Sequence, residues 1–199
     1  MARLAESRDV DGVMMFVRIW FNFFKPISTM NSYEWTSHFR RVYDTALQKY
    51  ASGNRDVSTF FLEEDQAFLV SIGARAIEFY DFAEDADDLP YECALLITFV
   101  RRDYFLNILR SRGATKKLGM DDFPAKDAEL GGIAWLPRLI LKAKARLRGE
   151  LPDELMYGCG GDRRFFKQYD IHPADFLRFV WATDGDEAKI LTYVQSGSA

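Results

Sequence analysis

Residues 65–83 read DQAFLVSIGARAIEFYDFA, and residues 162–180 read DRRFFKQYDIHPADFLRFV. The two stretches align without a gap at a constant shift of 97 residues, from 65 to 162. An aspartate, a phenylalanine, an acidic residue and two further phenylalanines coincide in that order. A second match, between residues 96–100 and residues 190–194, follows at a shift of 94, from 96 to 190. Two matches in the same order predict an internal duplication.

Helical periodicity precedes each of these stretches, and Gly53 and Gly149 end the two periodic segments as carboxyl-terminal caps. We therefore expect an all-α fold, in which two similar helical lobes from an internal duplication pack into one compact bundle. The alternative is a generic similarity between amphipathic helices, because the same spacing recurs in unrelated proteins. The apolar positions are Trp35, Phe39, Val42, Tyr43, Ala46, Leu47 and Tyr50, then Ile133, Leu136, Leu139, Ile140, Ala143 and Leu147.

The duplication divides the chain into four parts. Residues 30–110 are the first helical half, and residues 133–199 are the second. Residues 111–132 are rich in glycine and charge, which is typical of a connector. Residues 1–29 precede the first helical pattern, and we expect them to be a loosely attached leader.

An apolar run in this leader, VMMFVRIWFNFF at residues 13–24, is superficially similar to a signal or an anchor. Arg18 and Asn22 interrupt the run, no small-residue cleavage site follows it, and it is shorter than the roughly 20 residues that a bilayer requires. We expect an amphipathic docking helix and no stable membrane insertion. Cys93 and Cys159 are the only cysteines and form no disulfide or zinc pattern, so we expect a reducing cytoplasm, no metal and no cofactor.

The charge balance argues against a nucleic-acid partner. The 199 residues contain 26 basic and 30 acidic side chains, for a net charge of -4, whereas binding to phosphate backbones depends on basic residues. Residues 65–83 resemble a helix-turn-helix, but acidic residues from Glu78 to Asp88 would repel DNA. This acidic run can instead meet the basic face of residues 138–148, in this chain or in another. We expect Arg101 and Arg102, near a helix end, to lie on the surface.

The sharpest chemical signal is YGCGGDRRFF at residues 157–166. We expect Asp162 to cap a helix there, which places Cys159 just before the positive helix end. This position, with Arg163 nearby, lowers the pKa of a thiol, whereas the Asp162 carboxylate opposes ionisation. Cys159 and His172 are the candidate catalytic residues. In the alternative interpretation, His172 only caps the helix that Pro173 opens, and Cys159 fills a structural position that Leu62 occupies in the first half.

The same segment is a candidate anion site. Backbone N–H groups at Gly160 and Gly161 can meet an anion at a helix amino terminus, with Arg163 and Arg164 assisting. The glycine spacing does not match the phosphate-binding loop of nucleotide-binding proteins, because no Lys-Ser or Lys-Thr follows.

Three segments of the second half carry a resemblance: GGIAWLPRLILKAKARLRG at residues 131–149, YGCGGDRRFF at residues 157–166, and Asp175-Phe176 with Asp186-Glu187 leading to Tyr193. In these segments the chain resembles a bacterial family known as domain of unknown function 5069. The resemblance covers about a third of the chain and implies a soluble bacterial protein, without implying an activity. The family also tends to have a cysteine before its Asp-x-x-Phe-Phe helix, which favours a role for Cys159.

These observations favour a non-catalytic binding or interaction module. Its partner is expected to be another protein, a second copy of the chain or a small anionic ligand, bound through aromatic clusters and oppositely charged lobes. The alternative is a small enzyme that acts on an anionic metabolite in a cleft near Cys159.

Overall fold

The protein is described here by a computed structural model that places residues 33–197. Contacts divide the chain into two units, residues 1–36 and residues 37–199, and the fold given below is that of the second unit. The predicted leader and its apolar run at residues 13–24 lie outside the described residues. Within the described residues, the longest and most apolar helices still fall short of what a membrane span requires.

Helices make up the first half, with one 3₁₀ turn between the first two. The elements are α2 (Trp35–Ala51), η1 (Val57–Thr59), α3 (Glu63–Ser71), α4 (Ala76–Glu84) and α5 (Tyr91–Asn107). The chain leaves α2 through Gly53 and turns between α3 and α4 at Gly73, and both glycines have a positive φ that other residues rarely adopt.

The second half begins with a short hairpin and continues as helices. The elements are η2 (Met120–Asp122), β1 (Glu129–Leu130), β2 (Ile133–Ala134), α6 (Leu136–Arg148), α7 (Gly160–Gln168), α8 (Pro173–Ala182) and α9 (Glu187–Ser196). The two strands are antiparallel, with Leu130 opposite Ile133. The helix predicted from residue 133 therefore starts at residue 136, because Ile133 belongs to the hairpin. Gly149 ends α6 in a left-handed conformation, and Pro173 opens α8, as the sequence predicted.

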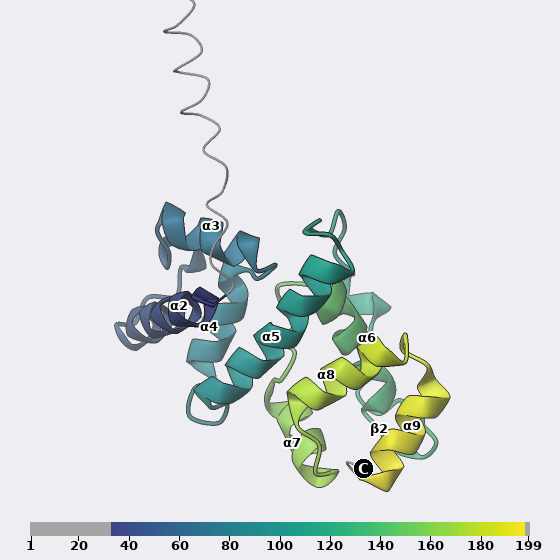
Figure 1. The fold of residues 1–199 in the computed structure, drawn as a ribbon. Helices are drawn as coiled ribbons and strands as arrows, with labels where there is room; N and C mark the ends of the chain where they lie inside the picture. Colours follow the sequence, from purple (N-terminus) through teal and green to yellow (C-terminus); the bar gives the residue numbers. More distant parts are fainter. Residues whose placement is uncertain (1–32, 198–199) are drawn as a thin grey trace, which may run out of the picture. The chain divides into compact units, whose positions relative to one another are not determined.

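Helices α5, α6 and α8 pack against one another at the centre of the fold. Figure 1 shows α2, α3 and α4 on one side of α5, and α8 and α9 on the other. The core contains completely buried residues from both halves, and burying each large side chain contributes about 2 to 3 kcal/mol. Those with no exposed surface include Phe39, Phe79, Ile97, Leu139, Phe176 and Leu177.

The prediction of an all-α fold is confirmed. Both halves contain a long helix, two short helices and a further helix in the same order. This order agrees with a duplication, and common ancestry of the two halves stays a prediction.

One face of α6 carries basic side chains into the interior. Arg138, Lys142 and Arg146 follow one another at intervals of four residues, which places them on the same face, and all three are buried. Arg138 donates a hydrogen bond to the carbonyl oxygen of Pro124, and Arg146 forms an ion pair with Glu78. The prediction that the acidic run meets the basic face is thus confirmed for the Glu78–Arg146 pair.

Candidate functional site

A buried carboxylate organises the beginning of α7. Asp162 Oδ2 accepts hydrogen bonds from Lys142 Nζ at 2.5 Å and from the backbone N–H of Gly158 at 2.9 Å. Asp162 Oδ1 accepts from Trp135 Nε1 at 2.9 Å. Lys142 and Asp162 have almost no exposed surface, so this ion pair is removed from water. With three donors, the carboxylate holds α6, the start of α7 and the loop between them together.

The helix cap predicted at Asp162 is wrong. Cys159 is the N-cap of α7, and Asp162 is the third residue of the helix. The Asp162 carboxylate bonds to Trp135, Lys142 and Gly158, which lie outside the first helical turn. Lys142 Nζ also donates a hydrogen bond of 3.3 Å to Cys159 Sγ. The thiol therefore has a cationic neighbour that sequence reasoning did not identify.

The glycines of this segment allow close packing against Trp135. A Cβ at Gly161 would lie 2.5 Å from the indole ring, so only glycine fits beneath it. Gly158 has a φ of 94°, in the left-handed region that glycine adopts without strain. Gly160 is exposed and keeps its predicted place at the amino terminus of α7.

The two arginines predicted to bind an anion have different surroundings. Arg163 Nη1 donates to Asp85 Oδ2 at 2.7 Å and to the carbonyl oxygen of Gly158 at 2.9 Å, and Nη2 lies 3.5 Å from Asp88. Its guanidinium thus already has anionic partners from the first half of the chain. Arg164 is exposed to solvent. Anion binding at these residues stays a prediction.

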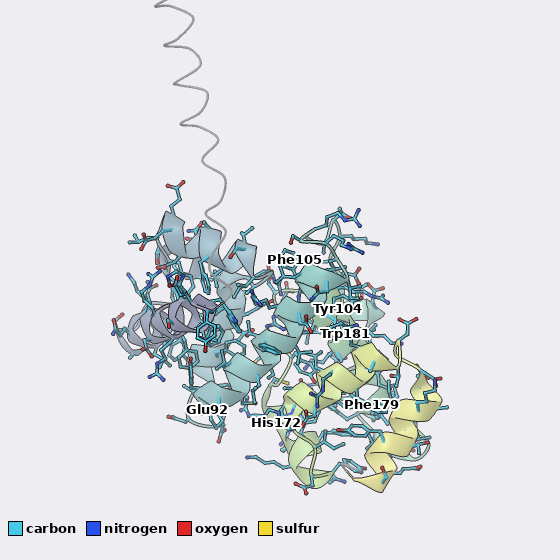
Figure 2. The ribbon with its side chains drawn as sticks, viewed as in Figure 1. Glu92, Tyr104, Phe105, His172, Phe179 and Trp181 are labelled. Carbon is cyan, nitrogen blue, oxygen red and sulfur yellow. The ribbon has the colours of Figure 1, made fainter. Side chains whose placement is uncertain are left out.

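A cavity of about 350 Å³ lies among α5, α7 and α8, and its lining includes Arg163, His172 and Cys93. Figure 2 shows His172 at the start of α8. Its Nδ1 accepts a hydrogen bond from the backbone N–H of Ala174, so His172 is the predicted helix cap. Burial raises the pKa of Cys93 to about 11, which keeps this thiol protonated at neutral pH. Cys159 does not line this cavity, so the two predicted catalytic residues, Cys159 and His172, do not share it.

A second cavity, of about 410 Å³, lies where three helices end. We call it the Arg101 pocket. It is bounded by the turn after α3, the last turns of α5, the loop that follows α5 and the glycine that ends α6. Its lining residues are Val70, Gly73, Ala74, Arg75, Arg101, Phe105, Ser111, Gly113, Ala114, Thr115, Lys116, Lys117 and Gly149.

Arg101 is the unusual residue of this pocket, because it is only 2% exposed. Its Nε and Nη1 are buried and have no hydrogen-bond partner, and no carboxylate within the described residues forms an ion pair with it. Burial and the nearby charge of Arg146 lower the pKa of Arg101 to about 10, so it is still cationic at neutral pH. A contact with the ring of Phe105, at 5.3 Å, provides a weak cation–π interaction. Figure 2 shows Phe105 on α5, well separated from His172.

The prediction that Arg101 lies on the surface is wrong. Ala94, Ile97, Arg101 and Phe105 follow one another at intervals of three or four residues, and all four are buried on one face of α5. This spacing was the signal that could have identified it, because an arginine on an otherwise apolar stripe must face the interior.

Two glycines with positive φ shape the Arg101 pocket. A Cβ at Gly73 would lie 2.4 Å from the ring of Phe105, and a Cβ at Gly149 would lie 2.8 Å from Arg101 Nη2. Their φ angles are 70° and 76°, which glycine adopts without strain. Glycine at these positions therefore allows the backbone to turn and leaves space for the side chains of Phe105 and Arg101.

Two of the other three cations that line the pocket are already paired, and the third, Lys116, is exposed to solvent. Arg75 Nη1 lies 2.6 Å from Asp153 and its Nε lies 3.2 Å from Glu78, while Lys117 Nζ lies 2.7 Å from the same Asp153 carboxylate. Glu78 is buried between Arg75 and Arg146. Arg101 therefore differs from Arg75 and Lys117 in forming no ion pair within the described residues, and from the exposed Lys116 in being buried.

Neither site has the ligands of a metal centre. Within residues 33–197, no three His, Cys, Asp or Glu side chains lie close enough together to hold a metal ion.

Comparison with known proteins identifies one part of the chain. No curated protein and no solved structure matches it. A match to one known protein family begins in the connector and covers the second half, which confirms the predicted resemblance. All lining residues of the Arg101 pocket except Gly149 lie before the matched region. Residues 123–198 are similar to the family described as Domain of unknown function (DUF5069).

Proposed function

We propose that the protein is a non-catalytic binding module and that the Arg101 pocket takes a small anionic ligand. The observation that carries this proposal is the buried guanidinium of Arg101, which lines a cavity and has no hydrogen-bond acceptor among the described residues. Buried charged groups normally have partners, because an unpartnered one loses its hydration without compensation. An anion in the pocket would give the charge of Arg101 the anionic partner that it lacks.

The local backbone explains how the charge is tolerated without a ligand. Helices α3, α5 and α6 end at residues 71, 107 and 148, beside the pocket. The carboxyl end of a helix carries partial negative charge, which stabilises a nearby cation. These dipoles offset part of the cost of burial, but they provide no hydrogen bond to Nε or Nη1. The same partial charges disfavour an anion, so the cationic side chains of the lining must outweigh them for a ligand to bind.

The lining of the pocket favours binding over catalysis. The described residues that line it include no histidine, cysteine, aspartate or glutamate that could act as a general acid or base. Its hydroxyl groups, on Ser111 and Thr115, have no histidine or carboxylate beside them in this lining, and its titratable side chains are cations, which suit the binding of an anion.

The test is a titration of ¹⁵N-labelled protein with benzoate and with sulfate at fixed ionic strength, followed by NMR. We expect saturable shifts at Gly113, Ala114 and Gly149, and we expect them to disappear in Arg101→Met. Arg163→Met is the matched control, because Arg163 has its own acidic partners and does not line the pocket. Unsaturable shifts, or equal shifts in Arg101→Met, would show that the pocket binds no anion.

A second candidate function is the small enzyme predicted near Cys159. The hydrogen bond from Lys142 Nζ to Cys159 Sγ favours it, because a nearby ammonium stabilises a thiolate. We expect iodoacetamide to modify Cys159 and to leave the buried Cys93 unmodified as the internal control. A Cys159 that reacts no faster than a free cysteine would remove the thiol from consideration.

The proposed interaction with a protein partner or a second copy of the chain stays a prediction. Size-exclusion chromatography with light scattering at two salt concentrations measures it directly.

A further inference from the structure

We infer that the ligand of the Arg101 pocket is a phosphomonoester with a small apolar body. This inference rests on the proposed function, since it names the chemical class of the anion that the pocket takes. It is drawn from the charge of the pocket, the free backbone donors of its loop and its apolar wall.

The charge of the lining suits a dianion better than a monoanion. Arg75, Arg101, Lys116 and Lys117 all line the pocket, and no carboxylate among the described residues does. A phosphomonoester carries a charge of about -1.5 to -2 at neutral pH, whereas a carboxylate or a sulfate ester carries -1. A phosphate group also suits a guanidinium, because two of its oxygens can accept hydrogen bonds from one arginine, and this would give Arg101 an anionic partner.

The loop after α5 offers backbone donors to the same ligand. It is held at both ends, where Ser111 N donates to Phe105 O and Leu118 N donates to Glu150 O, each at 2.9 Å. Between these anchors, the N–H groups of residues 113–117 donate no hydrogen bond within the described residues. A tetrahedral phosphate presents oxygens in several directions, so it can accept from this loop and from Arg101 together.

The remaining wall of the pocket is apolar. Val70, Ala74, Phe105 and Ala114 line it, and the cavity of about 410 Å³ lies in the range of small-molecule sites. The volume leaves room for a ring or a short chain attached to the phosphate. The ring of Phe105 provides a surface for such a body.

Asp153 competes with the ligand for two of the cations that line the pocket, Arg75 and Lys117. Its carboxylate holds both Arg75 and Lys117, although Asp153 itself does not line the pocket. Burial raises the pKa of Asp153, but Lys117 and Arg75 outweigh this effect and hold it below its ordinary value. Asp153 is therefore anionic at neutral pH. Removing its charge would release two cations for the ligand.

The experiment compares four probes by isothermal titration calorimetry at pH 7.5 and constant ionic strength. Phenyl phosphate and phenyl sulfate share their shape and differ in charge, benzoate is a planar monoanion, and inorganic phosphate lacks the apolar body. We expect phenyl phosphate to bind at least about tenfold more tightly than each of the other three, since one additional charge-assisted hydrogen bond corresponds to about a tenfold effect or more. Its affinity should decrease about tenfold from pH 7.5 to pH 5, because its second pKa is near 6.

Three variants locate the binding. Arg101→Met should weaken phenyl phosphate at least about thirtyfold, and Asp153→Asn should strengthen it about threefold to tenfold. Arg178→Met should leave the affinity unchanged, because Arg178 is exposed and lines neither cavity. Circular dichroism and thermal unfolding of each variant show whether it is folded, and the Asp153→Asn result stands on its own if Arg101→Met does not fold.

The outcomes distinguish the two levels of the proposal. If phenyl sulfate or benzoate binds as tightly as phenyl phosphate and still depends on Arg101, the pocket is an anion site but the phosphate class is wrong. If inorganic phosphate binds as tightly as phenyl phosphate, the inference that the ligand carries an apolar body is wrong. If all four probes bind equally to wild type and to Arg101→Met, or none binds and Asp153→Asn changes nothing, both the proposed function and its ligand class are overturned.

Discussion

The helix pair α3–α4 and the helix pair α7–α8 have the same helix ends, turn position and buried positions, and we call this common arrangement the frame. Helix α3 spans residues 63–71 and α7 spans residues 160–168, so the sequence shift of 97 residues also relates their ends. Helices α4 and α8 begin at residues 76 and 173, at the same shift. Gly73 and Asp170, at matched positions between the helices, both have positive φ. Phe79 and Phe176, also matched, are both completely buried.

The two pairs differ in how they use polar residues inside this frame. Asp65 and Asp162 are matched and buried, and each forms an ion pair with a basic residue of the preceding long helix. The partner of Asp65 is Arg41, which is 46% exposed, whereas the partner of Asp162 is Lys142, which is 1% exposed. The buried aspartate thus pairs with a partly exposed arginine in one half and with a fully buried lysine in the other.

The same contrast occurs in the second helix of each pair. Glu78 of α4 is buried and pairs with Arg146, whereas the matched Asp175 of α8 is exposed and pairs with Arg178. Apolar positions therefore maintain the shared frame, while buried charges distinguish the halves. We conclude that function should be sought where charge is buried in one half only, which includes the surroundings of Arg101.

The largest expected effect comes from removing the basic partner of each matched aspartate. Lys142→Met leaves Asp162 charged and buried without its cation, so we expect the free energy of unfolding to decrease by about 3 to 5 kcal/mol. Arg41→Met should cost less, about 1 to 3 kcal/mol, because Arg41 is 46% exposed although Asp65 itself is buried. Urea unfolding at pH 7 measures both. Equal losses would mean that the two ion pairs are equivalent after all.

The turns between the paired helices should respond in opposite directions. Gly73→Ala places a Cβ against Phe105 in a left-handed conformation, and we expect a loss of about 2 kcal/mol or more. Asp170→Gly relieves a positive φ of 51° and should stabilise the protein by about 0.5 kcal/mol. Thermal unfolding of both variants is the measurement. Destabilisation by Asp170→Gly would show that its side chain contributes more than its backbone strain costs.

A pH-dependent effect is expected at Asp81 of α4, whose matched residue in α8 is the exposed Arg178. Burial, with the nearby charge of Glu78, raises the pKa of Asp81 from 3.8 to about 7. Between these pH values the folded protein binds the proton and the unfolded chain does not, so the contribution of Asp81 to stability is lost as the pH rises from about 4 to about 7. We expect Asp81→Asn to remove this dependence and to be about 1 to 2 kcal/mol more stable than wild type at pH 8.

Denaturant unfolding of wild type and Asp81→Asn at pH 5 and pH 8 measures this effect, and Asp175→Asn is the exposed control. A difference between wild type and Asp81→Asn that is the same at both pH values would contradict the raised pKa.

Much of the frame could be predicted because its signals are local. Gly149 and Pro173 mark helix ends through their own backbone preferences, which act independently of the rest of the fold. The cap at Asp162 was mispredicted because acidic residues suit both the cap and the first helical turn, and contacts with Trp135 and Lys142 decided between them. Leu62, predicted to fill space, is instead 74% exposed at the start of α3.

The sequence by itself determined that the chain is helical, where the two helices capped by Gly53 and Gly149 end and which of their faces are apolar, because these properties follow from the spacing and the backbone chemistry of neighbouring residues. Only the tertiary structure decided which charges find partners. Lys142 has Asp162, Arg146 has Glu78, and Arg101 has no acceptor among the described residues. Partnering depends on distances between side chains that are far apart along the chain. Helical periodicity carries no information about those distances.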